Sequence, residues 1–200
     1  MSSSSSLVTR VRRRRFVLAV SALALALSAA TVSHAQVQGA SQDRDVIEIT
    51  VDVAEDLGGK FVPTLVKPEH TQPERGAFYV TEGRVFPGGT IQGDGADFNP
   101  YRIGHVGVWI SRGTHLVSAS DIPAADWWAH TAQLFVLGRQ GKEMMASEGL
   151  EGSGALTRVV TGGAGNYVGF IGEQRTTFLG FNPTGGVNLR VTFVLRKMVR

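Results

Sequence analysis

The sequence predicts an all-β domain that folds as an eight-stranded antiparallel barrel. All 25 glycines lie after residue 38, a distribution that disfavours a helical bundle because glycine destabilises a helix interior. Only residues 124–132 offer a brief helical possibility. Eight runs have the alternation or the β-branched and aromatic content of strands, and they cover residues 46–53, 78–86, 103–112, 130–137, 143–148, 156–161, 167–181 and 187–196.

The first run alternates between apolar and polar residues. Ile47, Ile49, Val51 and Val53 share one face, while Glu48, Thr50 and Asp52 share the other. A period of two is typical of a half-buried strand. A loop rich in proline, glycine and charge is expected from Asp56 to Gly76, before the second run.

The middle runs are separated by turn signals. Pro87-Gly88-Gly89 follows the second run, and residues 93–100 form a glycine- and aspartate-rich loop before the third. Two glycines within the third run suggest a bend or a close approach of backbones. Five residues, 182–186, join the last two runs as a hairpin loop.

The last run favours a barrel over a sandwich. Its odd-numbered residues from Val187 to Leu195 form a continuous apolar stripe. Such a stripe suits a small barrel that side chains fill or line, or an outer face that a partner subunit covers. Alternation alone does not say which face points inward.

The N-terminal segment has the organisation of a secretory signal peptide. Five arginines lie within the first fifteen residues, a fifteen-residue apolar stretch runs from Phe16 to Ala30, and Ser33-His34-Ala35 fits a cleavage site. The apolar stretch is shorter than the roughly 20 residues that a membrane-spanning helix needs. We therefore expect a signal peptide at 1–35, a flexible segment at 36–44 and the barrel at 45–200. The protein is expected to be secreted or periplasmic, with Arg13-Arg14-Arg15 leaving a twin-arginine route open.

Composition excludes several classes of function. Without the five leader arginines, the remainder carries 15 basic and 17 acidic side chains, which gives no charge argument for a nucleic-acid partner. No cysteine is present, so the chain has neither disulfides nor thiolate metal ligands. The histidines lack zinc-site spacing, so no metal site is expected.

The region from Arg158 to Glu173 resembles the glycine hairpin shared by allene oxide cyclase barrels and dirigent proteins. The matching positions are Gly162, Gly163, Gly165, Tyr167, Gly169 and Gly172. Residues 78–90, Trp109-Ile-Ser-Arg-Gly113 and residues 180–190 resemble the corresponding segments of bacterial allene oxide cyclase-like chains, so that the likeness covers roughly residues 45–197. The resemblance implies an eight-stranded barrel, commonly trimeric, with a mostly apolar cavity. In plant allene oxide cyclases that cavity holds a fatty-acid epoxide during ring closure, and in dirigent proteins it orients radical pairs.

The expected function is therefore a secreted allene oxide cyclase-like barrel that binds a small apolar molecule and steers its cyclisation or isomerisation without a cofactor. A lipocalin-like carrier without chemistry and a structural, oligomeric exported barrel are the alternatives. A dirigent-type coupling protein is less favoured, because Val168 to Ile171 replace the basic residues that dirigent chains carry after the glycine turn. Expected partners are a small apolar ligand and, in a homotrimer, further copies of the chain, with no membrane span after cleavage.

Candidate site residues follow from strand position and residue type. Glu48 and Asp52 are candidate general bases if their face lines the cavity, and a solvated outer face is the competing interpretation. His105 is a candidate donor within a pocket, and a hydrogen-bonded structural histidine is the alternative. Tyr79, Trp109 and Tyr167 are candidate ligand contacts, with core packing as the alternative. Gly162, Gly163, Gly165, Gly169 and Gly172 are expected to serve the turn.

Overall fold

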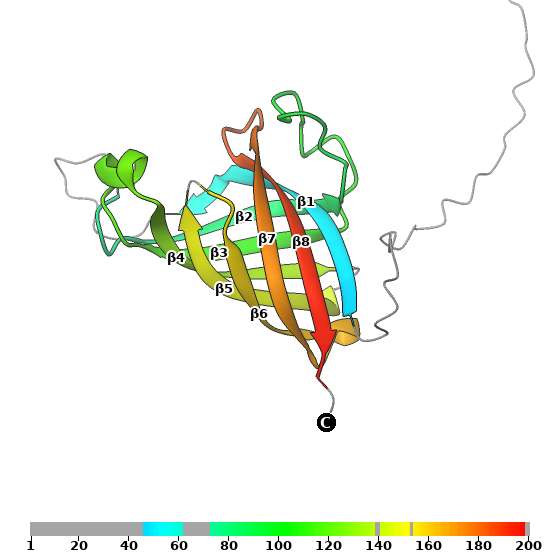
Figure 1. The fold of residues 1–200 in the computed structure, drawn as a ribbon. Helices are drawn as coiled ribbons and strands as arrows, with labels where there is room; N and C mark the ends of the chain where they lie inside the picture. The colour runs from blue at the N-terminus through cyan, green and yellow to red at the C-terminus, as the bar shows by residue number, and fades with distance from the viewer. Residues whose placement is uncertain (1–45, 62–72, 139–140, 153, 199–200) are drawn as a thin grey trace, which may run out of the picture. The chain divides into compact units, whose positions relative to one another are not determined.

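A computed structural model of the chain describes residues 46–61, 73–138, 141–152 and 154–198. The predicted signal peptide and the flexible segment lie outside these described residues. Within them, eight strands form a closed antiparallel barrel in which each strand pairs with its neighbours in sequence and β8 pairs back with β1 (Figure 1). The predicted fold class is confirmed.

The strands occupy most of the described chain. They are β1 (Val46–Phe61), β2 (Phe78–Pro87), β3 (Gly107–His115), β4 (Trp127–Leu137), β5 (Glu143–Gly152), β6 (Thr157–Ala164), β7 (Phe170–Phe181) and β8 (Val187–Lys197). Two short 3₁₀ turns, η1 (Ala119–Ala124) and η3 (Gly165–Tyr167), precede β4 and β7. Closure leaves no unpaired edge strand.

Several expected boundaries differ from the structure by a few residues, and three regions show the largest or most informative differences. The expected loop after Asp56 begins later, because β1 continues through an irregularity to Phe61, which pairs with Val80 of β2. The third strand begins at Gly107 rather than residue 103. The brief helix considered for residues 124–132 is replaced by η1 followed by β4, whose ladder with β3 runs from Ala129 to Leu137. In the first and third regions, pairing with another strand outweighs local composition, whereas residues 103–106 have no partner in the ladder.

One half of the barrel interior is filled by apolar side chains. The residues that face inward alternate along each strand, so that Val51, Val53, Val191, Phe193 and Leu195 come from the adjacent strands β1 and β8. The other buried members of this cluster are Val85, Trp109, Phe135, Leu137, Met145 and Val160. The apolar stripe of the last strand therefore faces inward, a point that alternation alone left open.

A second, smaller core lies outside the barrel wall. The loop between β2 and β3 packs Ile91 and Phe98 against Ala54 and Phe86, with Leu179 alongside. Phe86 and Phe98 meet edge to face with ring centroids 5.0 Å apart. The loop thereby covers the outer side of β1, including Asp52, which is fully buried.

Candidate ligand-binding site

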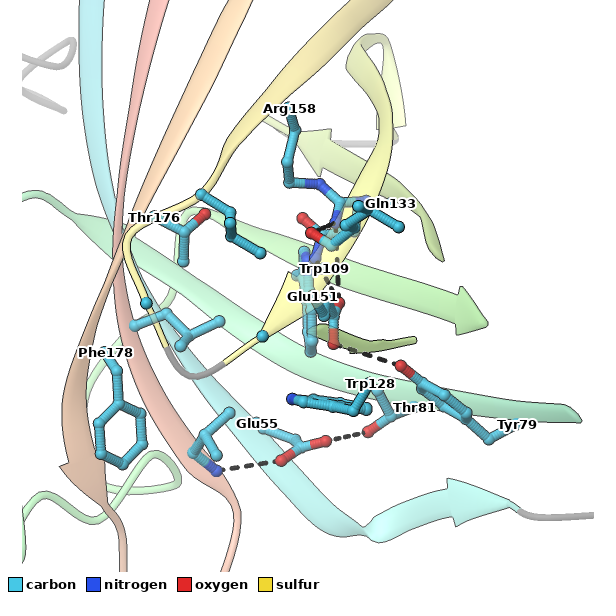
Figure 2. A pocket seen from close by; sticks show the side chains of 16 residues that line it. Glu55, Tyr79, Thr81, Trp109, Trp128, Gln133, Glu151, Arg158, Thr176 and Phe178 are labelled. Carbon is cyan, nitrogen blue, oxygen red and sulfur yellow. Dashed lines mark hydrogen bonds and ion pairs between the residues drawn. The ribbon is translucent and has the colours of Figure 1, made fainter. Parts of the chain in front are cut away.

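The half of the barrel opposite the packed core contains a pocket of about 520 Å³ (Figure 2). Trp109 belongs both to the pocket wall and to the apolar core, so it forms the boundary between the open and the filled halves. The apolar lining also includes Trp128, Phe178, Val187 and Leu189. A volume in this range is that of a small-molecule site.

Glu151 is the centre of the pocket's hydrogen bonding. Its Oε1 accepts hydrogen bonds from Thr131 Oγ1 and Gln133 Nε2, both at 3.0 Å. Its Oε2 accepts a bond of 3.2 Å from the Tyr79 hydroxyl, which comes from the facing strand β2. Three donors on two strands thus fix this carboxylate in place, with a coordination that suits its ionised form.

Arg158 lies behind Glu151 in the pocket wall. Its Nη1 is 4.0 Å from Glu151 Oε1 and donates to the carbonyl of Leu150 at 3.2 Å. Its Nη2 donates to the carbonyl of Thr131 at 2.7 Å. Burial lowers the pKa of this guanidinium, while the charge of Glu151 opposes that change. Arg158 therefore lies beside Glu151 on the protein side, with its terminal donors directed to backbone carbonyls.

Glu55 is a second buried carboxylate of the pocket. Its Oε1 accepts a bond of 2.6 Å from Thr81 Oγ1, and its Oε2 accepts one of 3.0 Å from the backbone N–H of Val187. Figure 2 shows both bonds, together with that between Tyr79 and Glu151. Glu55 therefore joins β1, β2 and the start of β8 at the pocket end of the barrel.

A chain of amides crosses the interior between the pocket and the core. Gln174 donates to Gln133 Oε1 at 2.8 Å and accepts from Ser147 Oγ at 2.5 Å. Gln133 then donates to Glu151, so that polar groups on β4, β5 and β7 form one network. Buried polar groups need such partners, because an unmade hydrogen bond costs about 1–3 kcal/mol.

Tyr79 is held in its neutral form. Burial raises the pKa of its phenol above the usual value of about 10, and the charge of Glu151 and the hydrogen bond to it raise it further. The folded state thus retains a proton that the unfolded chain releases above about pH 10, so this group's contribution to stability is lost as pH rises beyond that point.

We expect Tyr79→Phe to leave the phenolate absorbance of the folded protein unchanged up to about pH 11, because Tyr79 does not ionise there. The measurement is a spectrophotometric titration near 295 nm, which is tractable because the chain has three tyrosines. Urea-unfolded samples of both proteins are the control and should differ by one tyrosine. A difference of one tyrosine between the folded proteins would contradict the assignment.

The structure separates the three candidate ligand contacts. Tyr79 and Trp109 line the pocket. Tyr167 lies in η3 and packs against the apolar core cluster, in the filled half of the barrel. Burial raises the pKa of its phenol. The structure therefore brings two of the three together, and their contact with a ligand stays a prediction.

The three candidate catalytic residues lie outside the pocket. Glu48 is exposed, because its face of β1 is the outer face of the barrel. Asp52 shares that face and bonds to Arg190 and to the backbone of Ile91 beneath the covering loop. His105 is exposed in the loop before β3. Glu48 and Asp52 were candidate general bases only if their face of the strand lined the cavity, and that face points away from it.

The glycine hairpin adopts a conformation that needs glycine at particular positions. Gly165 and Gly169 have φ angles of +65° and +79°, which L side chains rarely adopt. Gly163 and Gly172 leave no room for a side chain, since an added Cβ would lie 2.5 Å from the Tyr167 Cβ and 2.0 Å from the Val194 carbonyl oxygen. These glycines permit close approach of the backbone at the filled end of the barrel.

Sequence reasoning missed the charged side chains of the pocket. Glu55 could have been found, because it continues the parity of Val51 and Val53 and so places a carboxylate on an apolar face. Glu151 and Arg158 carried no such signal, since their partners come from other strands: β2 and β4 for Glu151, and β4 and β5 for Arg158. Among the described residues, no cluster of three or more potential metal ligands occurs. Within the same residues, no helix has the length and apolarity to cross a membrane.

Comparison with known proteins supports the fold. No protein-family model and no curated protein matches the sequence. Solved structures of similar fold include the pterocarpan synthase dirigent protein PsPTS1, with a TM-score of 0.57 and 9% identity over 78% of this chain and 98% of that one. The pterocarpan synthase dirigent protein GePTS1 has a TM-score of 0.53 and 10% identity, over 78% of this chain and 87% of the other. The chain therefore has a dirigent-like barrel fold.

A structure described as a nonspecific heme-binding cyclase has a TM-score of 0.44 and 13% identity, covering 78% of this chain and 68% of that chain.

Proposed function

We propose that the protein is an allene oxide cyclase-like barrel that binds one small, mostly apolar molecule and steers its cyclisation or isomerisation. The pocket of about 520 Å³ is the observation that carries this proposal, because it combines an apolar wall with a few fixed polar groups. Such a site can hold a flexible molecule in one conformation and exclude water while a ring closes.

A non-catalytic carrier is the second candidate. All four oxygens of Glu55 and Glu151 accept hydrogen bonds from protein donors. Carboxylates engaged in this way orient a ligand more readily than they remove a proton from it. This arrangement supports ligand binding by a cyclase and by a carrier alike. In a cyclase, the shape of the pocket would then promote the reaction by holding the ligand in one conformation.

Export and assembly belong to the same proposal. The signal-peptide-like organisation of residues 1–35 supports a secreted or periplasmic protein. A homotrimer is proposed from the family resemblance.

We expect Thr176→Trp to weaken binding of the neutral fluorescent probe N-phenyl-1-naphthylamine by at least about tenfold, because the indole would occupy the pocket. Thr176 lines the pocket, whereas Thr177, the next residue of β7, is exposed. Thr177→Trp is therefore the matched control, with unchanged affinity. The measurement is a fluorescence titration of variants whose circular dichroism matches that of the wild type. Val187→Trp replaces the first variant if Thr176→Trp does not fold.

Equal affinity of Thr176→Trp and the wild type would reject the pocket as the binding site. Chemistry is tested by incubating the protein with a metabolite extract. Cyclisation and isomerisation conserve mass, so a cyclase produces a compound of unchanged mass and altered retention time, and Thr176→Trp does not. Enrichment of a chemically unchanged compound on the protein would support the carrier instead.

A further inference from the structure

The pocket carries a net negative formal charge. Among the described residues, three charged side chains line it, Glu55, Glu151 and Arg158, which gives two carboxylates against one guanidinium. Every hydrogen bond to the two carboxylates comes from a hydroxyl, amide or backbone N–H donor, which is the pattern that ionised carboxylates make. Concave sites lined by one sign of charge concentrate ligands of the opposite sign.

The charge that a ligand can reach is negative. The Arg158 side chain is 2% exposed, whereas that of Glu151 is 22% exposed. The two terminal nitrogens of Arg158 donate to the carbonyls of Leu150 and Thr131, on the protein side. A ligand that enters the pocket therefore meets the carboxylate, while the guanidinium stays behind the wall.

Aromatic rings form much of the remaining wall. Tyr79, Trp109, Trp128 and Phe178 all line the pocket, and Tyr79 and Trp128 stack with centroids 6.3 Å apart. His115 contacts this wall from behind, packing against both Tyr79 and Trp128. The faces of tryptophan and tyrosine attract cations, most strongly where water is excluded. The aromatic rings and the carboxylates of the pocket thus both favour a cationic ligand.

We propose that the pocket takes an organic cation, an apolar molecule that carries a protonated amine, in preference to neutral or anionic molecules of the same shape. This inference rests on the proposed binding function and narrows its substrate class. It also distinguishes the chain from the plant cyclases that it resembles, since the described lining of the pocket offers no accessible cation to pair with a fatty-acid carboxylate near Glu151.

The test uses three naphthalenes that differ in charge. 1-Naphthylmethylamine is a cation at pH 7, 1-naphthalenemethanol is neutral and 1-naphthoate is an anion. Each is titrated against the protein loaded with N-phenyl-1-naphthylamine. We expect the amine to bind at least about tenfold more tightly than the alcohol. The naphthoate should bind at least about tenfold more weakly than the alcohol. A unit charge on a ligand near a partly buried carboxylate changes the affinity by about this factor.

Charge variants locate the source of the preference. Glu151→Gln should reduce the ratio of amine to alcohol affinity by about fivefold or more, with the alcohol affinity largely retained. Glu82→Gln removes a carboxylate from an exposed position on β2 and should leave the ratio unchanged. Glu55→Gln serves in place of Glu151→Gln if the latter does not fold, because Glu55 is the other pocket carboxylate.

The outcomes separate this inference from the proposed function. If neither the probe nor any naphthalene binds, the proposed function fails. If the probe binds and the three naphthalenes bind equally, or if the alcohol or the naphthoate binds most tightly, the cation preference is wrong while the binding function stands. A ratio that is the same in Glu151→Gln and the wild type would also overturn the assignment.

Discussion

Phe135→Ala is expected to lower the free energy of unfolding by about 4 kcal/mol. Phe135 is fully buried in the filled half of the barrel and meets Phe193 edge to face, with centroids 4.8 Å apart. Removal of the ring loses both its burial and this aromatic contact, and the surrounding closed wall has little freedom to collapse into the cavity. Urea denaturation followed by circular dichroism measures the change.

The matched control is Phe181→Ala. Phe181 also meets a second ring edge to face, that of Phe178 with centroids 5.2 Å apart, but both rings are exposed. The two variants remove the same atoms and the same type of aromatic pair, so their difference isolates burial. We expect Phe181→Ala to cost less than about 1 kcal/mol. Similar losses in both variants would show that the filled half does not act as the main core.

Local sequence patterns are sufficient to predict the strands, whereas the site depends on contacts between strands that are far apart in the sequence. Alternation in residues 46–53 and 187–195 is sufficient to predict β1 and β8, because burial on one face of a strand imposes a period of two. The closure of the barrel and the direction of the inward face depend on pairing between strands far apart in the sequence. The closure of the barrel was supported by the family resemblance, and the direction of the inward face was left open.

Strand β6 shows why the pocket escaped prediction. Arg158 is 3% exposed and Val159 is 62% exposed, the reverse of what hydropathy suggests. The terminal nitrogens of the inward-pointing arginine donate to two backbone carbonyls on β4 and β5, and one of them lies 4.0 Å from Glu151. A local pattern contains no information about partners on other strands, so polar groups that face inward resemble surface residues.

Asp52 illustrates the same limit from the outer side of the wall. Its position among polar residues predicted a solvated or a catalytic carboxylate, yet a loop some forty residues later in the chain covers it. Ile91 of that loop donates its backbone N–H to Asp52 Oδ2 at 2.8 Å. Nothing near Asp52 in the sequence indicates this contact.

We expect Asp52→Ala to lower the free energy of unfolding by about 3 kcal/mol. Arg190 Nε donates to Asp52 Oδ1 at 2.8 Å, and Arg190 Nη2 also donates to the carbonyl of Ile91 at 2.9 Å. The substitution leaves the buried N–H of Ile91 without an acceptor and the arginine without its counter-ion. The Arg190 side chain is 36% exposed, so water compensates for part of the loss and the cost falls at the low end for a buried pair.

Glu48→Ala is the matched control, because Glu48 is an exposed carboxylate on the same face of the same strand and should cost less than about 0.5 kcal/mol. A double-mutant cycle with Arg190→Ala then separates the ion pair from the bond to the loop. If the ion pair between Asp52 and Arg190 accounts for most of the lost stability, Asp52→Ala lowers the free energy of unfolding only slightly in the Arg190→Ala background. If the loop contact dominates, Asp52→Ala remains costly in that background, because Ile91 still loses its acceptor. A cost for Asp52→Ala as small as that for Glu48→Ala would mean that the carboxylate does not hold the loop against the wall.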